Sequence, residues 1–206
     1  MKKLNKFAII EAVNDMYTIA KNVKNELIKK NSRFITLLIK ITTKDEIDNY
    51  LKEIKTIYPK ATHYCYAYKL TDQIKKASDD GEPSGTAGMP MLNILEKENI
   101  TNILAVTIRY FGGIKLGAGG LIRAYAKSVK EALNIVQKNE LINAYIGTIT
   151  FPYSKEKEII YQLTDENILE KNYLEDITYK VILPKDHPFI LDKKVKILTE
   201  SYIEKD

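Results

Sequence analysis

The chain has no tryptophan, one cysteine and two histidines in 206 residues. The lone Cys65 excludes an internal disulfide, and with only His63 and His187 beside it there is little material for a zinc site. No apolar run approaches the roughly 18 residues of a membrane span, and the first residues are too polar for a secretory signal. We therefore expect a reducing, cytoplasmic setting, while a hydrophobic content of 45% excludes a disordered chain.

Charge is unevenly distributed along the chain. Residues 1–140 carry 23 Lys and Arg against 15 Asp and Glu, whereas residues 141–206 carry 9 against 12. The basic first part favours anionic partners such as RNA, ribosomes or phosphorylated ligands. A lysine-rich genome gives the same excess, so charge alone does not decide the partner.

Hydrophobic periodicity predicts an α+β first part. Thr43 and Glu46 form a capping box that starts a helix ending before Pro59. One predicted strand alternates three tyrosines with His63, Cys65 and Ala67, and the two sets face opposite sides. Such a tyrosine row can stack RNA bases but more often packs beneath helices. The predicted strands are 32–42, 61–70 and 102–111, and the predicted helices are 47–58, 89–97 and 120–136, with Leu121, Ile122, Tyr125, Val129, Leu133 and Val136 facing inward.

A second part follows a predicted break near residues 139–145. Strands are expected at 144–151, 168–173 and 177–183, and helices at 154–163 and 188–199. This β-α-β-β-α order is typical of the ferredoxin-like split unit. The prediction is two α+β domains, residues 1–140 and residues 141–206.

Glycine is concentrated in one segment. Eight of the nine glycines lie between residues 81 and 120, which indicates backbone with positive φ or close approaches. The first glycine-containing loop, SDDGEPSGTAG at 78–88, carries Asp79, Asp80 and Glu82. These carboxylates repel one another unless a cation or basic group offsets them. The loop is a candidate Mg²⁺ site or a hook for basic side chains, the alternative being a solvated turn capped by Asp79.

The second loop, RYFGGIKLGAGG at 109–120, connects a strand end to a helix start. Such turns present free backbone amides at the positive end of the helix dipole, which favours anions. No Lys-Ser/Thr pair follows Gly117, and no glycine lies three residues after Gly119. Neither a Walker A loop nor a dinucleotide fingerprint is therefore present. We expect an anion site without a nucleotide-binding signature.

Basic side chains flank this second loop. Arg109 faces the same way as Thr107, and we expect the acidic loop to close over it as its counterion. On the following helix, Arg123, Lys127 and Lys130 form an outer stripe that suits phosphates, although a solvated helix face has the same pattern. His63 is more simply explained as a packed or hydrogen-bonded histidine than as the partner of a nucleophilic cysteine.

Three stretches resemble the bacterial YigZ branch of the IMPACT family. They are ATHYCYAY at 61–68, SDDGEPSGTAG at 78–88 and RYFGGIKLGAGG at 109–120, the last continued by Leu121, Arg123, Ala124 and Tyr125, with KNSRF at 30–34 upstream. The two loop motifs are long and specific. Residues from about 20 to 135 resemble the IMPACT domain, and those from about 143 resemble the small C-terminal domain of bacterial members.

The resemblance implies a fold and a role. The first domain would be built like domain IV of elongation factor G, with two helices on one face of a sheet and a left-handed crossover, which is a rare hand. The second would be a ferredoxin-like domain similar to domain V of the same factor. The eukaryotic family member regulates translation initiation, and bacterial members have been associated with nucleic-acid or ribosome binding.

The leading hypothesis is a non-enzymatic, cytoplasmic regulator of translation that binds RNA, the ribosome or a ribosome-associated protein. Its rivals are a phosphate-binding or Mg-dependent small-molecule enzyme and an adaptor that grips a protein through the acidic loop. No cofactor, resident metal or catalytic residue is assigned, and the oligomeric state is left open. Every one of these hypotheses needs the two loops in one pocket. The candidate site residues are His63, Asp79, Asp80, Glu82, Arg109, Lys115, Gly117, Gly119, Gly120, Arg123 and Lys127.

Overall fold

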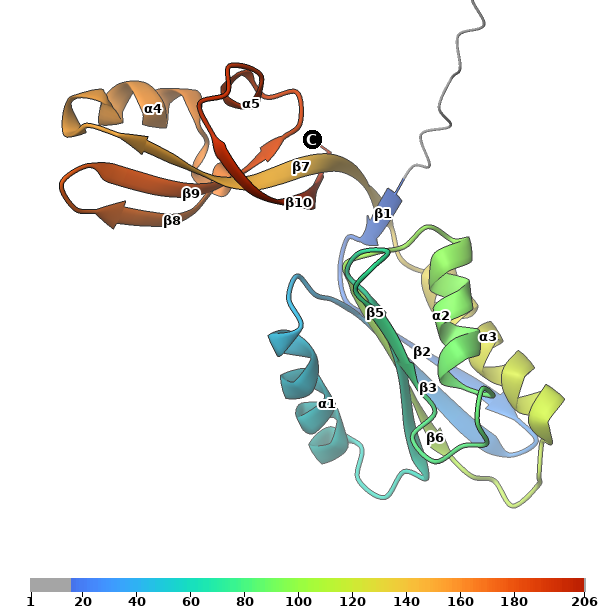
Figure 1. Cartoon of the computed structure of the whole chain (residues 1–206). Coiled ribbons are helices and arrows are strands. Elements are labelled where there is room, and N and C mark those ends of the chain that lie inside the picture. The colour runs from blue at the N-terminus through green and yellow to red at the C-terminus, as the bar shows by residue number, and fades with distance from the viewer. Residues whose placement is uncertain (1–15, 206) are drawn as a thin grey trace, which may run out of the picture. The chain divides into compact units, whose positions relative to one another are not determined.

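The computed structural model describes residues 16–205, which divide into two compact units between Asn139 and Glu140. Each unit has its own sheet and hydrophobic core (Figure 1). No helix within these residues is long and apolar enough to cross a membrane. The main elements are β1 (Met16–Ile19), β2 (Val23–Lys29), β3 (Ser32–Lys40), α1 (Asp45–Ile57), β4 (His63–Lys69), β5 (Lys75–Ser78), α2 (Gly88–Lys97), β6 (Ile103–Tyr110), α3 (Ala118–Asn134), β7 (Lys138–Phe151), α4 (Glu156–Gln162), β8 (Ile168–Tyr173), β9 (Ile177–Pro184), α5 (Pro188–Leu191) and β10 (Lys196–Glu204).

The first unit is built on an antiparallel sheet with strand order β2-β3-β6-β4-β5. The three strands predicted from hydrophobic alternation are β3, β4 and β6, and each boundary lies within two residues of the prediction. The strands β2 and β5 were not predicted. Both are edge strands of mixed, mostly half-exposed residues, so neither carries an uninterrupted apolar face.

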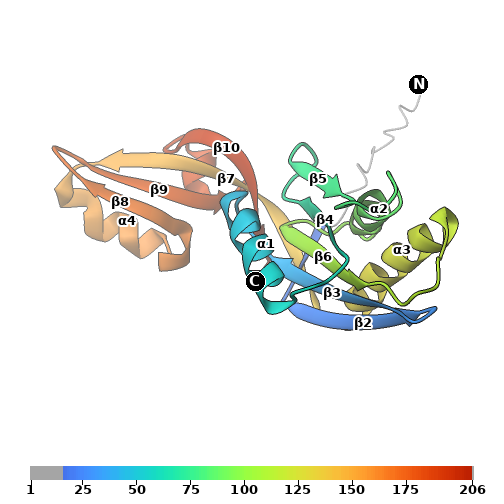
Figure 2. The same cartoon turned by 90° about the horizontal axis from the view of Figure 1, so that it is seen from below.

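Helices cover both faces of this sheet (Figures 1 and 2). On one face α2 and α3 pack over a core that includes Phe34, Cys65, Met91 and Tyr125. These are the two helices expected on one face. The opposite face is covered by α1, a third helix, which packs with the row Tyr64, Tyr66 and Tyr68. The tyrosine row therefore lies beneath a helix, and the alternation predicted for β4 is confirmed.

The connections require one rare crossover. From β3 to β4 the chain crosses β6 by way of α1, and from β5 to β6 it crosses β4 in the opposite direction by way of α2. The starting strands β3 and β5 run antiparallel to each other, so both crossovers would share one hand if their helices lay on the same face. The helices lie on opposite faces, so one crossover is left-handed, as the resemblance implied.

Two details of these helices differ from the sequence-based expectations. The Glu46 carboxylate accepts the backbone N–H groups of Thr42 and Thr43, but the Thr43 hydroxyl also donates to Glu46 instead of capping a helix amide. Only half of the predicted capping box is therefore formed. Ile122, predicted to face inward, is 42% exposed because its position on α3 turns toward solvent.

The second unit is a four-strand antiparallel arrangement with the order β10-β7-β9-β8. Its elements follow the order β-α-β-β-α-β, which extends the predicted pattern by one strand. The predicted helix over 188–199 is wrong. The helix stops at Leu191, Lys193 adopts a left-handed φ of 56°, and the remainder pairs with β7 as β10. The strand predicted over 144–151 begins earlier, because β7 runs continuously from Lys138 to Phe151 through the predicted break.

Candidate functional site

The site is centred on the ends of three neighbouring strands in the first unit. In the sheet register, Arg109 of β6 lies opposite Phe34 of β3 on one side and opposite His63 of β4 on the other. The alternation of the strands directs these side chains to the face that carries α2 and α3. The acidic loop, residues 79–87, and the glycine-rich loop, residues 111–117, join the sheet to these two helices.

A buried ion pair joins the acidic loop to the sheet. The Nη1 atom of Arg109 donates to Oε1 of Glu82 at 2.6 Å, and the two side chains are 6% and 3% exposed. The Tyr125 hydroxyl of α3 donates to the same carboxylate at 2.8 Å, and Nη2 of Arg109 donates to the Ser32 hydroxyl at 3.2 Å. The expectation that the acidic loop supplies the counterion of Arg109 is confirmed.

Aromatic rings hold the guanidinium of Arg109 in place. Its central carbon lies 5.4 Å from the Phe34 ring centre and 5.5 Å from that of Phe111, both within cation–π range. Its Nε atom is buried and has no hydrogen-bond partner among the described residues. Arg109 is therefore fixed in position while retaining unused donor capacity.

His63 is hydrogen-bonded, which confirms the interpretation preferred from the sequence. Its Nδ1 donates to the backbone carbonyl of Asp80 at 2.9 Å, which leaves Nε2 3.9 Å from a carboxylate oxygen of Glu82. Beneath it, the Cys65 thiol donates to the carbonyl of Asp79 at 2.9 Å. Burial raises the pKa of this thiol to about 12, against the smaller opposing effect of its bond to Tyr125. Cys65 is thus a structural residue and not a nucleophile.

The other two carboxylates of the acidic loop hold the loop's own backbone. Burial favours the neutral form of Asp79, but the N–H groups of Gly85, Gly88 and Ala87 outweigh it and hold the pKa of this carboxyl below its usual range. Asp80 accepts the N–H of Tyr64 at 2.7 Å. The turn-capping interpretation of Asp79 is therefore correct. In the described part of the chain no three His, Cys, Asp or Glu side chains are grouped to hold a metal ion, and the three carboxylates of this loop are engaged by backbone N–H groups and by Arg109.

The glycine-rich loop leads into an uncapped helix. Gly117 has a φ of 69°, and the first hydrogen bond of α3 runs from Leu121 N–H to its carbonyl. The amides of residues 118–120 have no intrahelical acceptor, no side chain caps them, and the first turn carries no acidic residue. Earlier in the loop, a Cβ on Gly112 would lie 2.0 Å from the carbonyl carbon of Asn31, so only glycine allows this close approach.

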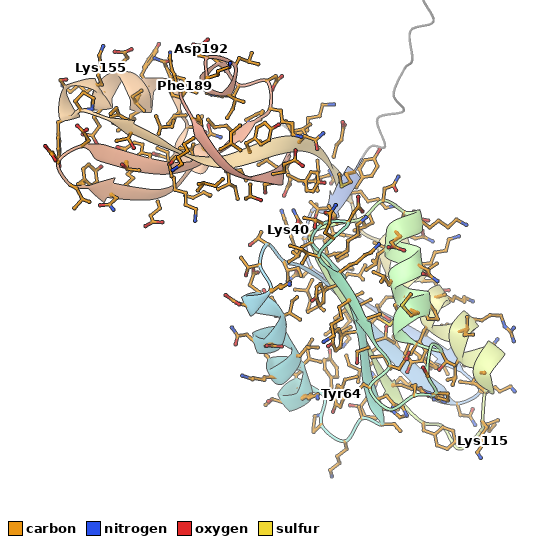
Figure 3. The ribbon with its side chains drawn as sticks, in the orientation of Figure 1. Lys40, Tyr64, Lys115, Lys155, Phe189 and Asp192 are labelled. Carbon is orange, nitrogen blue, oxygen red and sulfur yellow. The ribbon has the colours of Figure 1, made fainter. Side chains whose placement is uncertain are left out.

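The two loops share one pocket of about 390 Å³, here called the loop pocket. Lys115 lies on its glycine-rich side, on the segment that leads into α3 (Figure 3). The prediction that the two loops meet in one pocket is confirmed. Its lining consists of Thr62, His63, Glu82, Pro83, Arg109, Phe111, Lys115, Leu116, Gly117, Ala118 and Leu121.

A second, basic pocket of about 260 Å³ lies on the other side of Leu116. It is lined by Lys29 and Lys30 at the β2–β3 turn and by Arg123 and Lys127 of α3, and we call these four side chains the basic surface. The Nζ atom of Lys127 also lies 3.5 Å from Oε1 of Glu131 on the same helix. Gly120 belongs to this lining, whereas Gly119 lies beside the Arg123 guanidinium.

The predicted site residues thus separate into three groups. His63, Glu82, Arg109, Lys115 and Gly117 line the loop pocket, Gly120, Arg123 and Lys127 line the basic pocket, and Asp79 and Asp80 brace the acidic loop. The remaining predicted residue, Gly119, lines neither pocket. The residues of the site that were not predicted include Ser32, Phe111, Tyr125, Lys29 and Lys30. All five lie in or next to the quoted family-like stretches, which was the one signal for them.

Comparison with known proteins places these features in a family. Residues 30–133 match the model of the Impact N-terminal domain. The protein named IMPACT family member YigZ from Escherichia coli is 34% identical over 161 residues, which cover 75% of this chain and 79% of that relative. The chain belongs to the IMPACT family. The matched range contains the whole lining of the loop pocket and all of the basic-pocket lining except Leu27 and Lys29.

Other IMPACT-family relatives differ in how much of the chain they match. IMPACT family member YvyE from Bacillus subtilis is 49% identical over 124 residues, or 59% of this chain, and the match spans only 57% of that relative's length. A crystal structure described as that of a hypothetical protein is 30% identical with a TM-score of 0.71, covering 93% of this chain and 98% of its own. The similarity to that structure therefore includes both units.

Proposed function

We propose that this IMPACT-family chain is a non-enzymatic, cytoplasmic regulator of translation that binds RNA through the basic surface. One observation carries the proposal: the lining of the basic pocket contains four cationic side chains and no acidic one. The resemblance to a family whose eukaryotic member regulates translation initiation supports the translational role. The proposed likeness of residues 1–140 and 141–206 to domains IV and V of elongation factor G agrees with it.

The basic surface suits a phosphate backbone for three reasons. Lys29, Lys30 and Arg123 are exposed and come from two separate elements, so they can contact successive phosphates. The planar guanidinium of Arg123 matches phosphate oxygens in a bidentate geometry. The exposed contact between Lys127 and Glu131 is worth little and is easily exchanged for a phosphate.

Removal of Arg123 and Lys127 tests the proposal. Each phosphate contact on a single strand contributes about 0.7 to the slope of log K against log salt concentration. The Arg123→Ala/Lys127→Ala double variant is therefore expected to bind a single-stranded RNA oligonucleotide more weakly and with a slope shallower by about 1.4. Filter binding at several salt concentrations measures both quantities.

A matched control removes the same charge from the other face of the sheet. Lys44 and Lys52 are exposed residues of the α1 region, so Lys44→Ala/Lys52→Ala changes net charge equally without touching the basic surface. The proposal fails if both double variants lose the same affinity, or if the salt slope is unchanged at the basic surface. Partners that survive nuclease treatment in a crosslinking pull-down would instead indicate a ribosome-associated protein.

A further inference from the structure

The loop pocket has a chemistry that RNA binding at the basic surface leaves unused. We propose that it binds a phosphate monoester carried on a flat apolar body, as in a nucleoside monophosphate, either free or at the end of an RNA strand. This inference goes beyond the proposed function and concerns a different set of residues.

The size and walls of the loop pocket fit a small molecule. Its volume of about 390 Å³ lies within the range of roughly 300–1,000 Å³ seen for small-molecule sites. Much of the wall is apolar, formed by Pro83, Phe111, Leu116 and Leu121. The Phe111 ring is 47% exposed although it lies against the Arg109 guanidinium, so the ring remains free to pack against a flat ligand.

One end of the pocket is suited to an anion. Gly117 and Ala118 bring the start of the 17-residue helix α3 into the lining, where the amide of Ala118 has no intrahelical acceptor. Lys115 is exposed in the same lining, and no ion pair involving it is seen in the described structure. The Ala118 amide, at the positive end of the α3 dipole, and the Lys115 ammonium group suit the doubly charged head of a phosphate monoester.

Arg109 gives an independent indication that the pocket is incomplete. Its side chain is 6% exposed and lines the pocket, and its buried Nε–H has no partner among the described residues. Such a donor is costly unless an acceptor is supplied. The carboxylate in the lining, Glu82, is already neutralised by Arg109 and Tyr125. The pocket is therefore cationic overall, with a donor still unsatisfied.

The position of the pocket accounts for both forms of the ligand. Leu116 lines the loop pocket and also the basic pocket, so the two are neighbours on the same surface. A free mononucleotide would occupy the loop pocket alone. A strand ending there would continue toward Arg123 and Lys127. The two forms share the phosphate monoester and differ in whether the basic surface contributes to binding.

The key variant is Ala118→Glu in the full-length chain. A carboxylate in the first turn of α3 stabilises the helix through its dipole, so the melting temperature is expected to be unchanged or higher. The same carboxylate occupies the anion seat, and binding of uridine 5′-monophosphate, measured by calorimetry, is expected to fall at least tenfold. Thr56→Glu, which adds the same charge to exposed α1, is the control and is expected to bind normally.

Further binding measurements separate the contribution of the nucleoside from that of the phosphate. Uridine without phosphate and inorganic phosphate without the base are each expected to bind at least tenfold more weakly than the monophosphate. Lys115→Ala is expected to weaken monophosphate binding about tenfold. The Arg123→Ala/Lys127→Ala variant is expected to leave it within twofold, so a failure of RNA binding and a failure of this pocket are distinguishable.

The outcomes decide the proposal. Retained monophosphate binding by Ala118→Glu, or equal binding of inorganic phosphate and the monophosphate, overturns it. It is also overturned if the wild-type chain does not bind either the monophosphate or a 5′-phosphorylated RNA. A 5′-phosphorylated oligonucleotide that binds more tightly than both the monophosphate and its 5′-hydroxyl counterpart identifies the strand end as the source.

Discussion

Replacement of Glu82 by glutamine tests whether the buried ion pair holds the first unit together. The glutamine side chain would keep the size of the original and an oxygen that accepts from Tyr125, so the change removes mainly the charge. The Arg109 guanidinium, 6% exposed, would then be left without its counterion. Removing one partner of a buried pair costs about 3–5 kcal/mol. We expect a loss near the lower end, about 3 kcal/mol, because a neutral hydrogen bond to Arg109 remains.

Urea denaturation followed by circular dichroism measures this loss in the free energy of unfolding. The Glu82→Gln/Arg109→Met variant provides the second half of the test, since removing both charges of a buried pair is often close to neutral. It is therefore expected to recover most of the stability lost by Glu82→Gln. A loss below about 1 kcal/mol for Glu82→Gln would refute the reasoning. So would a double variant whose loss equals the sum of the two single losses.

Three further predictions concern the residues around this pair. Because the pKa of Cys65 is raised to about 12, its thiol is expected to resist a thiol reagent such as dithionitrobenzoate at pH 8 in the native state and to react fully in denaturant. The pKa of folded Asp79 lies below its unfolded value of about 3.9, so its contribution to stability is present above that value and is lost as the pH falls through the folded pKa. Asp79→Asn should therefore flatten the acid limb of stability against pH, and an unchanged limb would contradict the assignment. Gly112→Ala is expected to lower the free energy of unfolding by more than about 2 kcal/mol, because its Cβ would lie 2.0 Å from the carbonyl carbon of Asn31. Gly119→Ala is the control and is expected to keep or raise the melting temperature, because its Cβ would contact only the end of the Arg123 side chain, at 3.5 Å.

Much of the first unit follows from local pattern because its central strands have distinct faces. In β4 the alternation of Cys65 and Ala67 with the tyrosines predicted which residues pack under α2 and α3 and which under α1. The same rule oriented Arg109 toward the acidic loop. A buried central strand leaves little freedom, since a shift of one residue would exchange its two faces.

Other features depend on distant parts of the chain and have no local signature. The apolar residues of 188–199 suit a helix as well as a strand, and pairing with β7 decides the matter. The sequence also does not distinguish the roles of the three carboxylates of the acidic loop. Asp79 and Asp80 turn to backbone amides while Glu82 reaches Arg109, because Asp80 and Gly81 both adopt positive φ and reverse the chain between them. Lys29 and Lys30 join Arg123 only through the packing of α3 on β2 and β3.

The hydrogen bonds around Arg109 join positions 32, 82, 109 and 125, each supplied by a different element or loop. A short peptide taken from either loop would lack the residues that pair with its charged side chain. Either loop grafted onto another protein would therefore keep its sequence but lose its conformation. A fragment that retains the site must span at least residues 32–125. Swinging the acidic loop outward would strand Glu82 and Arg109 without partners, so a ligand must enter an aperture that is already open.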